Sequence, residues 1–430
     1  MVAKQIQRVG FTPFNGEYKK IYRKAKPYDI EKWQEAIALE HETMIRSRQI
    51  AADMGLELFV LDDGWFGNKY PRDNDHQGLG DWDIMKKKLP NGFTPIIEEG
   101  KKQGIKFGLW IEPEMVNPRS ELYEKHPDWA ITLPNREIVT KRNQLVLDLS
   151  NPDVQDYVFS IVDKLLTDYP DIAYFKWDCN AEITNIYSHY LGEDQQHLYV
   201  DHVRGLYNIL DRVKAKYPNV PMMMCARGGG RCDFQGLEYF TEFWTSDDTD
   251  PVERLFIQYG MGHFMPSKVL CAHVARWNSD VKIKFRTNVA MMGKLGYDYD
   301  IHEWDEKELA YSKQAVKNYE KLKPAILDGD LYRLISPYSG THAVNQFMSK
   351  DGKLGAIFTF DIYPRWGEHY YNVKLQGLDP NARYDIYEID RFDAGDFKYG
   401  EYTGEYLMEV GIPILTGHKL HSRVYEIKKH

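Results

Sequence analysis

Short apolar runs alternate with amphipathic helical stretches over most of the first 300 residues, and this alternation constrains the fold more than any other feature. The runs expected to form strands are Gln7–Phe11, Leu56–Leu61, Lys106–Ile111, Ile172–Trp177, Val220–Cys225, Phe243–Ser246, Val269–Ala272 and Ala290–Gly293. Helical periodicity marks Ile30–Met54, Thr94–Gln103, Asp153–Thr167 and Leu198–Tyr217. Strands separated by helices pair in parallel through crossovers. The pattern therefore predicts an α/β fold, a (β/α)8 TIM barrel over residues 1–325.

The pattern changes after a helix expected at Asp305–Leu322. From about Tyr332 onward the chain consists of short alternating stretches without a convincing helix: YRLISP, LGAIFTFDIY, HYYNVKLQGL, ARYDIYEID and SRVYEIKK. Such stretches are typical of antiparallel strands. We therefore expect a small all-β antiparallel sandwich or sheet domain over residues 326–430, with the boundary near Lys323–Gly329.

Composition and charge exclude several classes of function. The net charge is −9 and no basic stripe is present, which argues against a nucleic-acid partner. No run of about 18 apolar residues and no apolar leader occurs, so we expect neither a membrane span nor an export signal. The four cysteines lack zinc-type spacing and are too few for a disulfide framework. Reduced thiols predict a reducing compartment and a cytoplasmic location.

Motifs for other chemistries are missing. The chain has no G-x-S-x-G, no H-E-x-x-H and no G-x-G-x-x-G fingerprint, and Gly228–Gly230 lacks the Lys and Ser/Thr of a phosphate loop. Oxygen ligands suit magnesium or calcium, so a metal site from Asp62, Asp63, Glu112 and Asp178 is one alternative. Without any further support for it, we expect no metal and no cofactor.

Polar residues follow five of the predicted strands in succession. They are Asp62 and Asp63, Glu112 and Glu114, Asp178, Cys225, and Asp247 and Asp248. In a parallel barrel, the carboxyl ends of the strands meet at one rim, where catalytic residues lie. The sequence therefore predicts one site built from these side chains.

Paired carboxylates are the remaining strong chemistry, because glycoside hydrolysis requires two carboxyl groups in different environments. Lys176 lies two positions before Asp178 on the same strand face, where its charge favours an ionised carboxylate. Asp247 adjoins Asp248, and the shared negative charge raises the pKa of at least one of them. A helix cap is the alternative interpretation of Asp178, and Asp250 before Pro251 is a typical helix cap.

Several stretches resemble the α-galactosidases of glycoside hydrolase family 36. They are LDDGWFG (61–67), KFGLWIEPEMVNPRSELYEKHPDW (106–129), KRNQLVLDLS (141–150), FKWDCN (175–180) and CARGGGRCD with FWTSDDTDPVERLFIQYG (225–260). The resemblance runs in order over about residues 56–300 and more loosely beyond. It implies a retaining hydrolase that releases terminal α-linked galactose from oligosaccharides.

The resemblance also implies a role for each matching residue. The nucleophile is Asp178 and the general acid/base is Asp247. The residues expected to bind the sugar are Asp62 and Asp63 at the 4- and 6-hydroxyls, Trp110 along the pocket, Arg142 and Lys176 at further hydroxyls, and Cys225 with a backbone amide near Gly228 at the 2-hydroxyl. Asp248 is expected beside them, supplying charge and holding its loop.

The sequence departs from the family pattern in three places. The family usually carries a large N-terminal β domain, which in some members supports a homo-oligomer, whereas only residues 1–60 precede LDDGW here. Phe11 or Phe14 stands where the family has a pocket tryptophan. Arg227 replaces a glycine near the 2-position of the sugar, and we interpret it as a surface-facing residue. The alternative is that it reshapes the 2-position pocket, which would suit an α-N-acetylgalactosaminidase. The missing domain and tryptophan leave sugar binding with weak catalysis as a further alternative.

Overall fold

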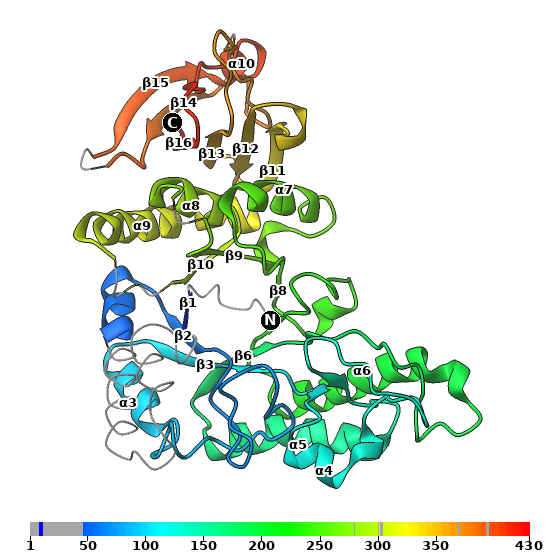
Figure 1. Cartoon of the computed structure of the whole chain (residues 1–430). Coiled ribbons are helices and arrows are strands. Elements are labelled where there is room, and N and C mark those ends of the chain that lie inside the picture. Colours follow the sequence, from blue (N-terminus) through cyan, green and yellow to red (C-terminus); the bar gives the residue numbers. More distant parts are fainter. Residues whose placement is uncertain are drawn as a thin grey trace. The chain divides into compact units, whose positions relative to one another are not determined.

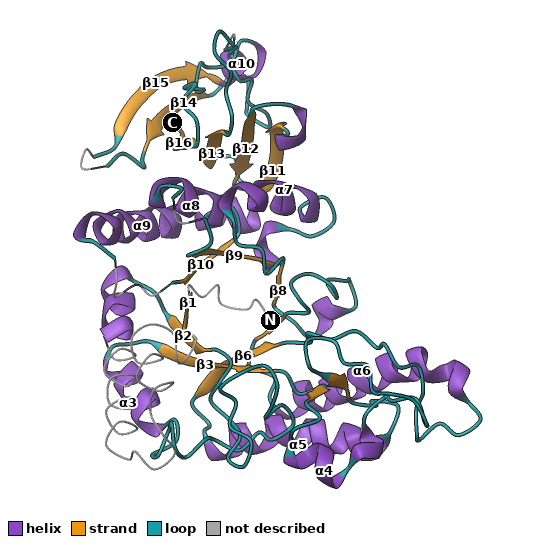
Figure 2. Cartoon of the chain, in the orientation of Figure 1, coloured by secondary structure: helices purple, strands orange, loops and turns teal. Residues whose placement is uncertain are grey.

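Eight strands form a closed barrel in the computed structural model, in the order β1-β10-β9-β8-β7-β6-β3-β2, where β1 is Arg8–Phe11. The structure describes residues 8–11, 46–278, 280–299, 301, 304–368, 370–392 and 395–430. Figure 1 traces these elements along the chain, and Figure 2 separates helices from strands. The TIM-barrel class predicted from the alternation of strands and helices is confirmed. The chain divides into two compact units, one mainly of residues 57–243 and one mainly of residues 244–430.

The first unit contains the barrel strands that carry most of the predicted site. They are β2 (Leu58–Leu61), β3 (Lys106–Ile111), β6 (Ile172–Trp177), β7 (Met222–Met224) and most of β8 (Glu242–Trp244). Each pairs in parallel with its neighbour. All four residues of β2 are buried, as expected for a strand covered on both faces. The predicted bounds of β3 and β6 are confirmed to the residue.

Helices cover these strands much as the periodicity predicts. Residues 46–54 are helical, and the rest of the helix expected at Ile30–Met54 lies outside the described residues. The other helices of this unit are α3 (Thr94–Lys102), α4 (Glu121–Lys125), α5 (Pro152–Asp168) and α6 (Leu198–Lys216). A short hairpin of β4 (Met115–Val116) and β5 (Leu145–Val146) follows β3. None of the described helices has the length and apolar character needed to cross a membrane.

The second unit begins with the helix α7 and two further barrel strands. These elements are α7 (Pro251–Met261), β9 (Leu270–Ala275), α8 (Ile283–Ala290), β10 (Lys294–Asp298) and α9 (Glu306–Asp328). Asp250 caps α7 by accepting hydrogen bonds from the amides of Val252 and Glu253, with Pro251 as the first helical residue. The predicted cap is confirmed.

One strand prediction is wrong. The run Ala290–Gly293 is not a strand: Ala290 ends α8, a turn follows, and β10 begins at Lys294. A short buried apolar run at the end of a helix has the same composition as a buried strand, so periodicity does not separate them. Lys294 is itself buried, which masks the strand in the sequence.

The rest of the second unit is the predicted all-β antiparallel domain. Its six described strands form one sheet in the order β11-β12-β13-β16-β14-β15. They are β11 (Asp330–Ile335), β12 (His342–Met348), β13 (Leu354–Asp361), β14 (Arg383–Glu388), β15 (Phe397–Thr403) and β16 (His421–Lys429). The boundary expected at residues 325 and 326 falls in the last turn of α9 and stays a prediction.

Irregular chain and a short helix form the second layer on this sheet. Val373, Leu375, Ile412 and Ile414 pack with buried residues of β13, β14 and β16 in one apolar cluster. The helix α10 (Gly404–Glu409) adds Leu407 to it, although no helix was expected there. On the barrel side of this unit, α8 and α9 contact the sheet (Figure 1).

Gly205 of α6 packs against the carbonyl of Leu149, where a Cβ atom would overlap that oxygen. Replacing a helical glycine by alanine normally stabilises by about 1 kcal/mol, but overpacking costs about 1–3 kcal/mol. We therefore expect Gly205→Ala to lower the free energy of unfolding. Gly260→Ala in α7 is the matched control, because a Cβ atom there has open space, and it should be neutral or stabilising. Denaturant unfolding of both variants measures this, and a stabilised Gly205→Ala would contradict the packing argument.

Candidate active site

Parallel register gathers the predicted residues of the first unit at the carboxyl ends of its strands. Ile111 pairs with Trp177, and Trp177 pairs with Met224. The residues that follow these partners are Glu112, Asp178 and Cys225. The amide of Asp178 donates to the carbonyl of Ile111 at 2.8 Å, and the amide of Cys225 donates to the carbonyl of Trp177 at 2.8 Å. The main-chain ladder therefore places these three residues side by side.

Both carboxylate oxygens of Asp178 accept hydrogen bonds. Trp110 Nε1 donates to Oδ2 at 3.0 Å, and the amide of Cys179 donates to Oδ1 at 2.8 Å. Asp178 is 5% exposed. No helix begins here, because residues 179–194 form a loop, so the helix-cap interpretation is wrong. Each oxygen keeps a lone pair beyond the bond it accepts, which leaves the carboxylate able to act as a nucleophile.

Asp62 and Lys176 form a half-buried ion pair. Lys176 Nζ lies 2.8 Å from Asp62 Oδ2, although the two residues are 114 positions apart. Burial alone disfavours the charged lysine, but nearby acidic groups, Asp62 first and Asp178 among them, outweigh it and raise the pKa of Lys176 well above its usual value. Asp62 Oδ1 also accepts from the amide of Asp63 at 2.9 Å.

Asp63 pairs with a different cation, Arg72, which sequence reasoning missed. Arg72 Nη2 lies 2.9 Å from Asp63 Oδ2, and Nε lies 3.0 Å from Oδ1, so the guanidinium holds the carboxylate with two nitrogens. Arg72 is 2% exposed. The only signal in the sequence is the run YPRDND after LDDGW, which gives no indication that its arginine turns inward. Asp62 and Asp63 are thus held apart by separate positive charges.

Trp110 and Arg142 lie in different kinds of structure. Trp110 lies within β3, is 2% exposed and stacks with Phe66 at a ring distance of 6.2 Å. Arg142 lies at the tip of a tight turn in which Lys141 and Gln144 exchange backbone hydrogen bonds. Arg142 and Asn143 have φ of 55° and 62°, which a two-residue hairpin turn of this kind requires. Arg142 is exposed, whereas Gln144 is buried.

The glycine-rich loop after β7 carries Cys225, Arg227 and Gly228. Cys225 is 1% exposed and is a free cysteine, as are the other three cysteines. Arg227 and Gly228 have φ of 51° and 86°, a conformation that glycine adopts more readily than arginine. Arg227 forms an exposed ion pair with Glu182 in the loop after β6. This contact agrees with the interpretation of Arg227 as a surface-facing residue.

In the second unit, the loop after β8 separates its three aspartates. Asp247 is exposed, and its Oδ1 accepts from Trp244 Nε1 at 3.0 Å. Asp248 turns back into its own loop, because its Oδ1 accepts from the amide of Asp250 at 2.9 Å. Arg254 donates to the carbonyls of Asp248 and Ser246 and stiffens the same turn. His273 packs its ring against Trp244 at 4.6 Å.

The two glutamates of the EPE segment have different partners. Arg231 donates from Nη1 and Nη2 to Glu114 at 2.9 and 2.7 Å, and Trp177 Nε1 donates at 2.7 Å. Burial opposes the charge of Glu114, but Arg231 outweighs it and lowers the pKa. Glu112 instead accepts from the amide of Asn180 at 2.6 Å and from Gln144 Nε2 at 3.2 Å. Burial, reinforced by Asp178, raises the pKa of Glu112 well above its usual value.

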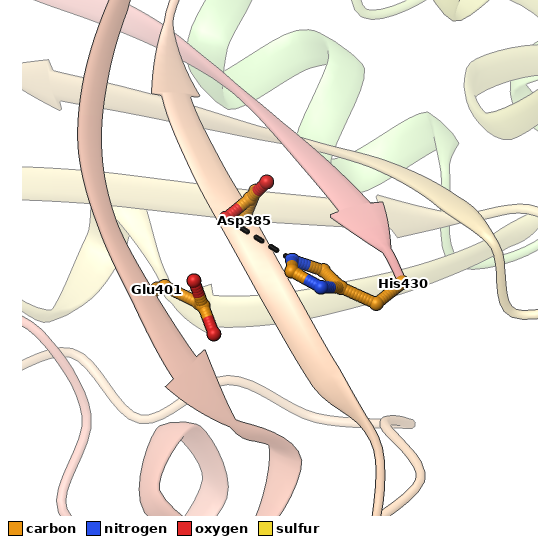
Figure 3. A group of neighbouring side chains, drawn as sticks. All are labelled: Asp385, Glu401 and His430. Carbon is orange, nitrogen blue, oxygen red and sulfur yellow. Dashed lines mark ion pairs between the residues drawn. The ribbon is translucent and has the colours of Figure 1, made fainter.

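Potential metal ligands gather elsewhere, on the C-terminal sheet. Within the described residues, one group of His, Asp and Glu side chains has a metal-like spacing: Asp385, Glu401 and His430 (Figure 3). Its carboxylates already carry Lys398 at 2.6 Å from Asp385 and Arg383 at 2.6 Å from Glu401. In the predicted site, Asp62 and Asp63 are likewise engaged by Lys176 and Arg72. In both groups, therefore, the carboxylates form ion pairs with lysine or arginine side chains.

A surface cavity of about 690 Å³ lies elsewhere in the first unit, between residues 82–92 and α5. Trp82, Tyr157, Ile161 and Tyr169 are among its lining residues. None of the predicted site residues lines it, so it is separate from the site at the strand ends.

Two family models match the chain. The Melibiase model matches residues 16–329, and the model of the glycosyl hydrolase family 36 C-terminal domain matches residues 342–427. Among curated proteins, alpha-galactosidase AgaA of Geobacillus stearothermophilus is 38% identical over 399 residues, which are 90% of this chain and 52% of the relative. Probable alpha-galactosidase C of Aspergillus terreus is 40% identical over 376 residues, 84% of this chain and 48% of the relative. The chain thus spans about half the length of these relatives.

Solved structures give the same result. The crystal structure of the family 36 alpha-galactosidase AgaA of Geobacillus stearothermophilus has a TM-score of 0.84 at 37% identity and covers 90% of this chain and 53% of its own. An AgaA variant in complex with raffinose has a TM-score of 0.86 at 34% identity, with coverage of 99% and 55%. The matched family models and these relatives show that the chain belongs to glycoside hydrolase family 36.

Proposed function

We propose that this protein is a retaining α-galactosidase that releases terminal α-linked galactose from oligosaccharides. The observation that carries the proposal is the environment of Asp178, a buried carboxylate near Lys176 and Glu112 with both oxygens held by N–H donors. Relatives that are 38% and 40% identical are named alpha-galactosidases, and one solved relative holds raffinose.

In the proposed first step, a carboxylate oxygen of Asp178 attacks the anomeric carbon of the galactoside. The bond from that carbon to the leaving oxygen breaks, and Asp247 donates its proton to the leaving oxygen. A β-galactosyl ester of Asp178 and the free aglycone result. In the second step, water attacks the anomeric carbon, gives its proton to Asp247, and displaces Asp178. The product is α-galactose, with configuration retained.

Charged hydrogen-bond partners explain the proposed preference for galactose. Asp62 and Asp63 are proposed to accept from the 4- and 6-hydroxyls, with Lys176 and Arg142 donating to further hydroxyls. Ion pairs with Lys176 and Arg72 fix the two carboxylates in place before substrate arrives. A sugar that lacks the axial 4-hydroxyl forms fewer charged hydrogen bonds with these half-buried carboxylates, which lowers kcat/KM by a large factor.

The 2-position is proposed to face Cys225 and the backbone at Gly228, with Trp110 along the pocket. Asp248 is proposed to support this site from its loop. The exposed Arg227–Glu182 ion pair draws the Arg227 side chain toward a neighbouring loop. This contact favours galactose over N-acetylgalactosamine as the substrate, because an Arg227 side chain held by Glu182 does not change the shape of the 2-position pocket.

Parallel assays of an aryl α-galactoside and an aryl α-N-acetylgalactosaminide test the substrate. We expect hydrolysis of the galactoside, with much lower kcat/KM for the acetamido sugar. Faster hydrolysis of the acetamido sugar would identify an α-N-acetylgalactosaminidase. Galactose binding without turnover of either substrate would identify a sugar-binding protein. Proton NMR of the first product formed should show α-galactose, and β-galactose would contradict retention.

Replacing Asp178 tests the nucleophile. We expect Asp178→Ala to lower kcat by several orders of magnitude with little change in the unfolding midpoint, because no ester forms. Added azide then enters from the vacated face and yields β-galactosyl azide, which NMR identifies. Asp168→Ala, at the exposed end of α5, is the control and should keep wild-type activity. Wild-type turnover by Asp178→Ala would remove the assignment.

Replacing Asp247 tests the general acid/base, and the azide product is expected to have the opposite configuration from that of Asp178→Ala. We expect Asp247→Ala to lower kcat/KM by about 10²–10⁴-fold for raffinose and much less for an activated aryl galactoside, whose leaving group needs no proton. Azide then attacks the galactosyl ester in place of water and yields α-galactosyl azide. If this variant instead formed a β-galactosyl azide, the assigned roles of Asp178 and Asp247 would have to be exchanged.

A further inference from the structure

Glu112 is a buried carboxyl group next to the proposed nucleophile, and the two-step mechanism leaves it without a role. It is 0% exposed and directly follows Ile111, whose carbonyl accepts the amide of Asp178. Its own Oε1 accepts the amide of Asn180 at 2.6 Å. Strand β3 therefore holds the chain on both sides of Cys179, once through the main chain and once through this carboxyl.

Glu114, two residues later, shows what an ionised glutamate requires in this interior. It is also 0% exposed, and it has a two-nitrogen ion pair with Arg231 and a further donor in Trp177. Across the described part of the chain, no Lys, Arg or His forms such an ion pair with Glu112. A buried carboxylate without a cation is costly, and a carboxyl group in that position normally keeps its proton.

The hydrogen-bond partners of Glu112 also lack a donor. Two acceptors on the residues that bond it, Gln144 Oε1 and Asn180 Oδ1, are buried and without a partner among the described residues. A proton on Glu112 adds one donor to this group. Turning the Gln144 amide by 180° would let its oxygen accept that proton at the 3.2 Å contact now made by Nε2.

The charged groups around Glu112 favour the neutral form on balance. Asp178 and Asp63 disfavour a further negative charge, whereas Arg72 favours one. Arg72, however, is already engaged by Asp63. Burial is the largest influence and acts in the same direction as the two aspartates, so the pKa of Glu112 is raised well above 4.5.

We propose that Glu112 is held as a neutral carboxylic acid and is a positioning residue for Asp178. Its Oε1 anchors the Cys179–Asn180 segment, whose Cys179 amide bonds the nucleophile. Its neutral state leaves Asp178 free of a second negative charge from this side. The positioning role rests on the proposed function, whereas the protonation state can be measured without any activity.

Stability as a function of pH tests the proton directly. The native wild type holds a proton that the unfolded chain releases above about pH 4.5, so its stability falls as pH rises, relative to Glu112→Gln. We expect the ratio of wild-type to variant unfolding constants to rise by up to about tenfold per pH unit between pH 5 and 7. A ratio that is independent of pH would overturn the proposal.

Glu114→Gln is the matched control, since it is the same substitution two residues away. It removes a charge that the native state keeps, so it should leave the half-buried Arg231 without its carboxylate partner and lower the unfolding midpoint at neutral pH. It should not give the rising ratio expected for Glu112→Gln. The same pH slope in both variants would overturn the assignment to Glu112.

Infrared spectroscopy of the wild type keeps the proposal testable if Glu112→Gln does not fold. With ¹³C-labelled glutamate, a protonated carboxyl band that shifts on labelling should be present at pH 7. Its absence would overturn the neutral state.

Kinetics test the positioning role. Glu112→Gln keeps an oxygen for the Asn180 amide, so kcat and the acidic limb of kcat/KM should match wild type. Glu112→Ala loses that anchor, and kcat should fall on the order of 10²-fold at similar KM. If the acidic limb of kcat/KM moved to lower pH in Glu112→Gln, the substitution would have removed a negative charge, and the neutral state would be contradicted. If Glu112→Ala had the same kcat as wild type, the positioning role would be contradicted. Inactivity of the wild type would instead refute the proposed function, and the stability and infrared results on Glu112 would still stand.

Discussion

The parallel register between β3 and β6 is the constraint on which the candidate site depends. It aligns Trp110 with Lys176 and Ile111 with Trp177. One residue beyond this pairing, the amide of Asp178 still bonds the carbonyl of Ile111. A shift by one residue would turn each inward side chain outward, because successive residues of a strand point to opposite faces. Trp110, Lys176 and Asp178 would then no longer share one side of the sheet.

Charge pairing is the second constraint, because the register alone would crowd several carboxylates together. Asp62 has Lys176, Asp63 has Arg72 and Glu114 has Arg231, so each of these acids has its own cation. Among the described residues, Asp178 has two N–H donors and no cation at contact distance. Glu112 also has no ion-pair partner among them, and burial raises its pKa well above its usual value. The site therefore contains carboxyl groups in three distinct environments, which is what acid–base and nucleophilic roles require.

The fold and much of the site could be predicted from the sequence, where the signal is local. The period of apolar residues gave the bounds of β3 and β6, and the Asp250–Pro251 pair identified the start of α7. The same signal failed at Ala290–Gly293, because a buried helix end and a buried strand have one composition. It also missed α10, a six-residue helix too short to show a period.

The family resemblance identified Asp178 and Asp247. Neither that resemblance nor the periodicity of apolar residues predicts which side chains from separate segments come into contact. Arg72 meets Asp63 across nine residues, Arg231 meets Glu114 across 117, and Asn180 meets Glu112 across 68. By itself, the sequence determined the alternating elements, the acidic residues after each strand and the family to which they belong. Only the tertiary structure decided which acid has a cation and which keeps a proton, because burial and partner distance are properties of the packed chain.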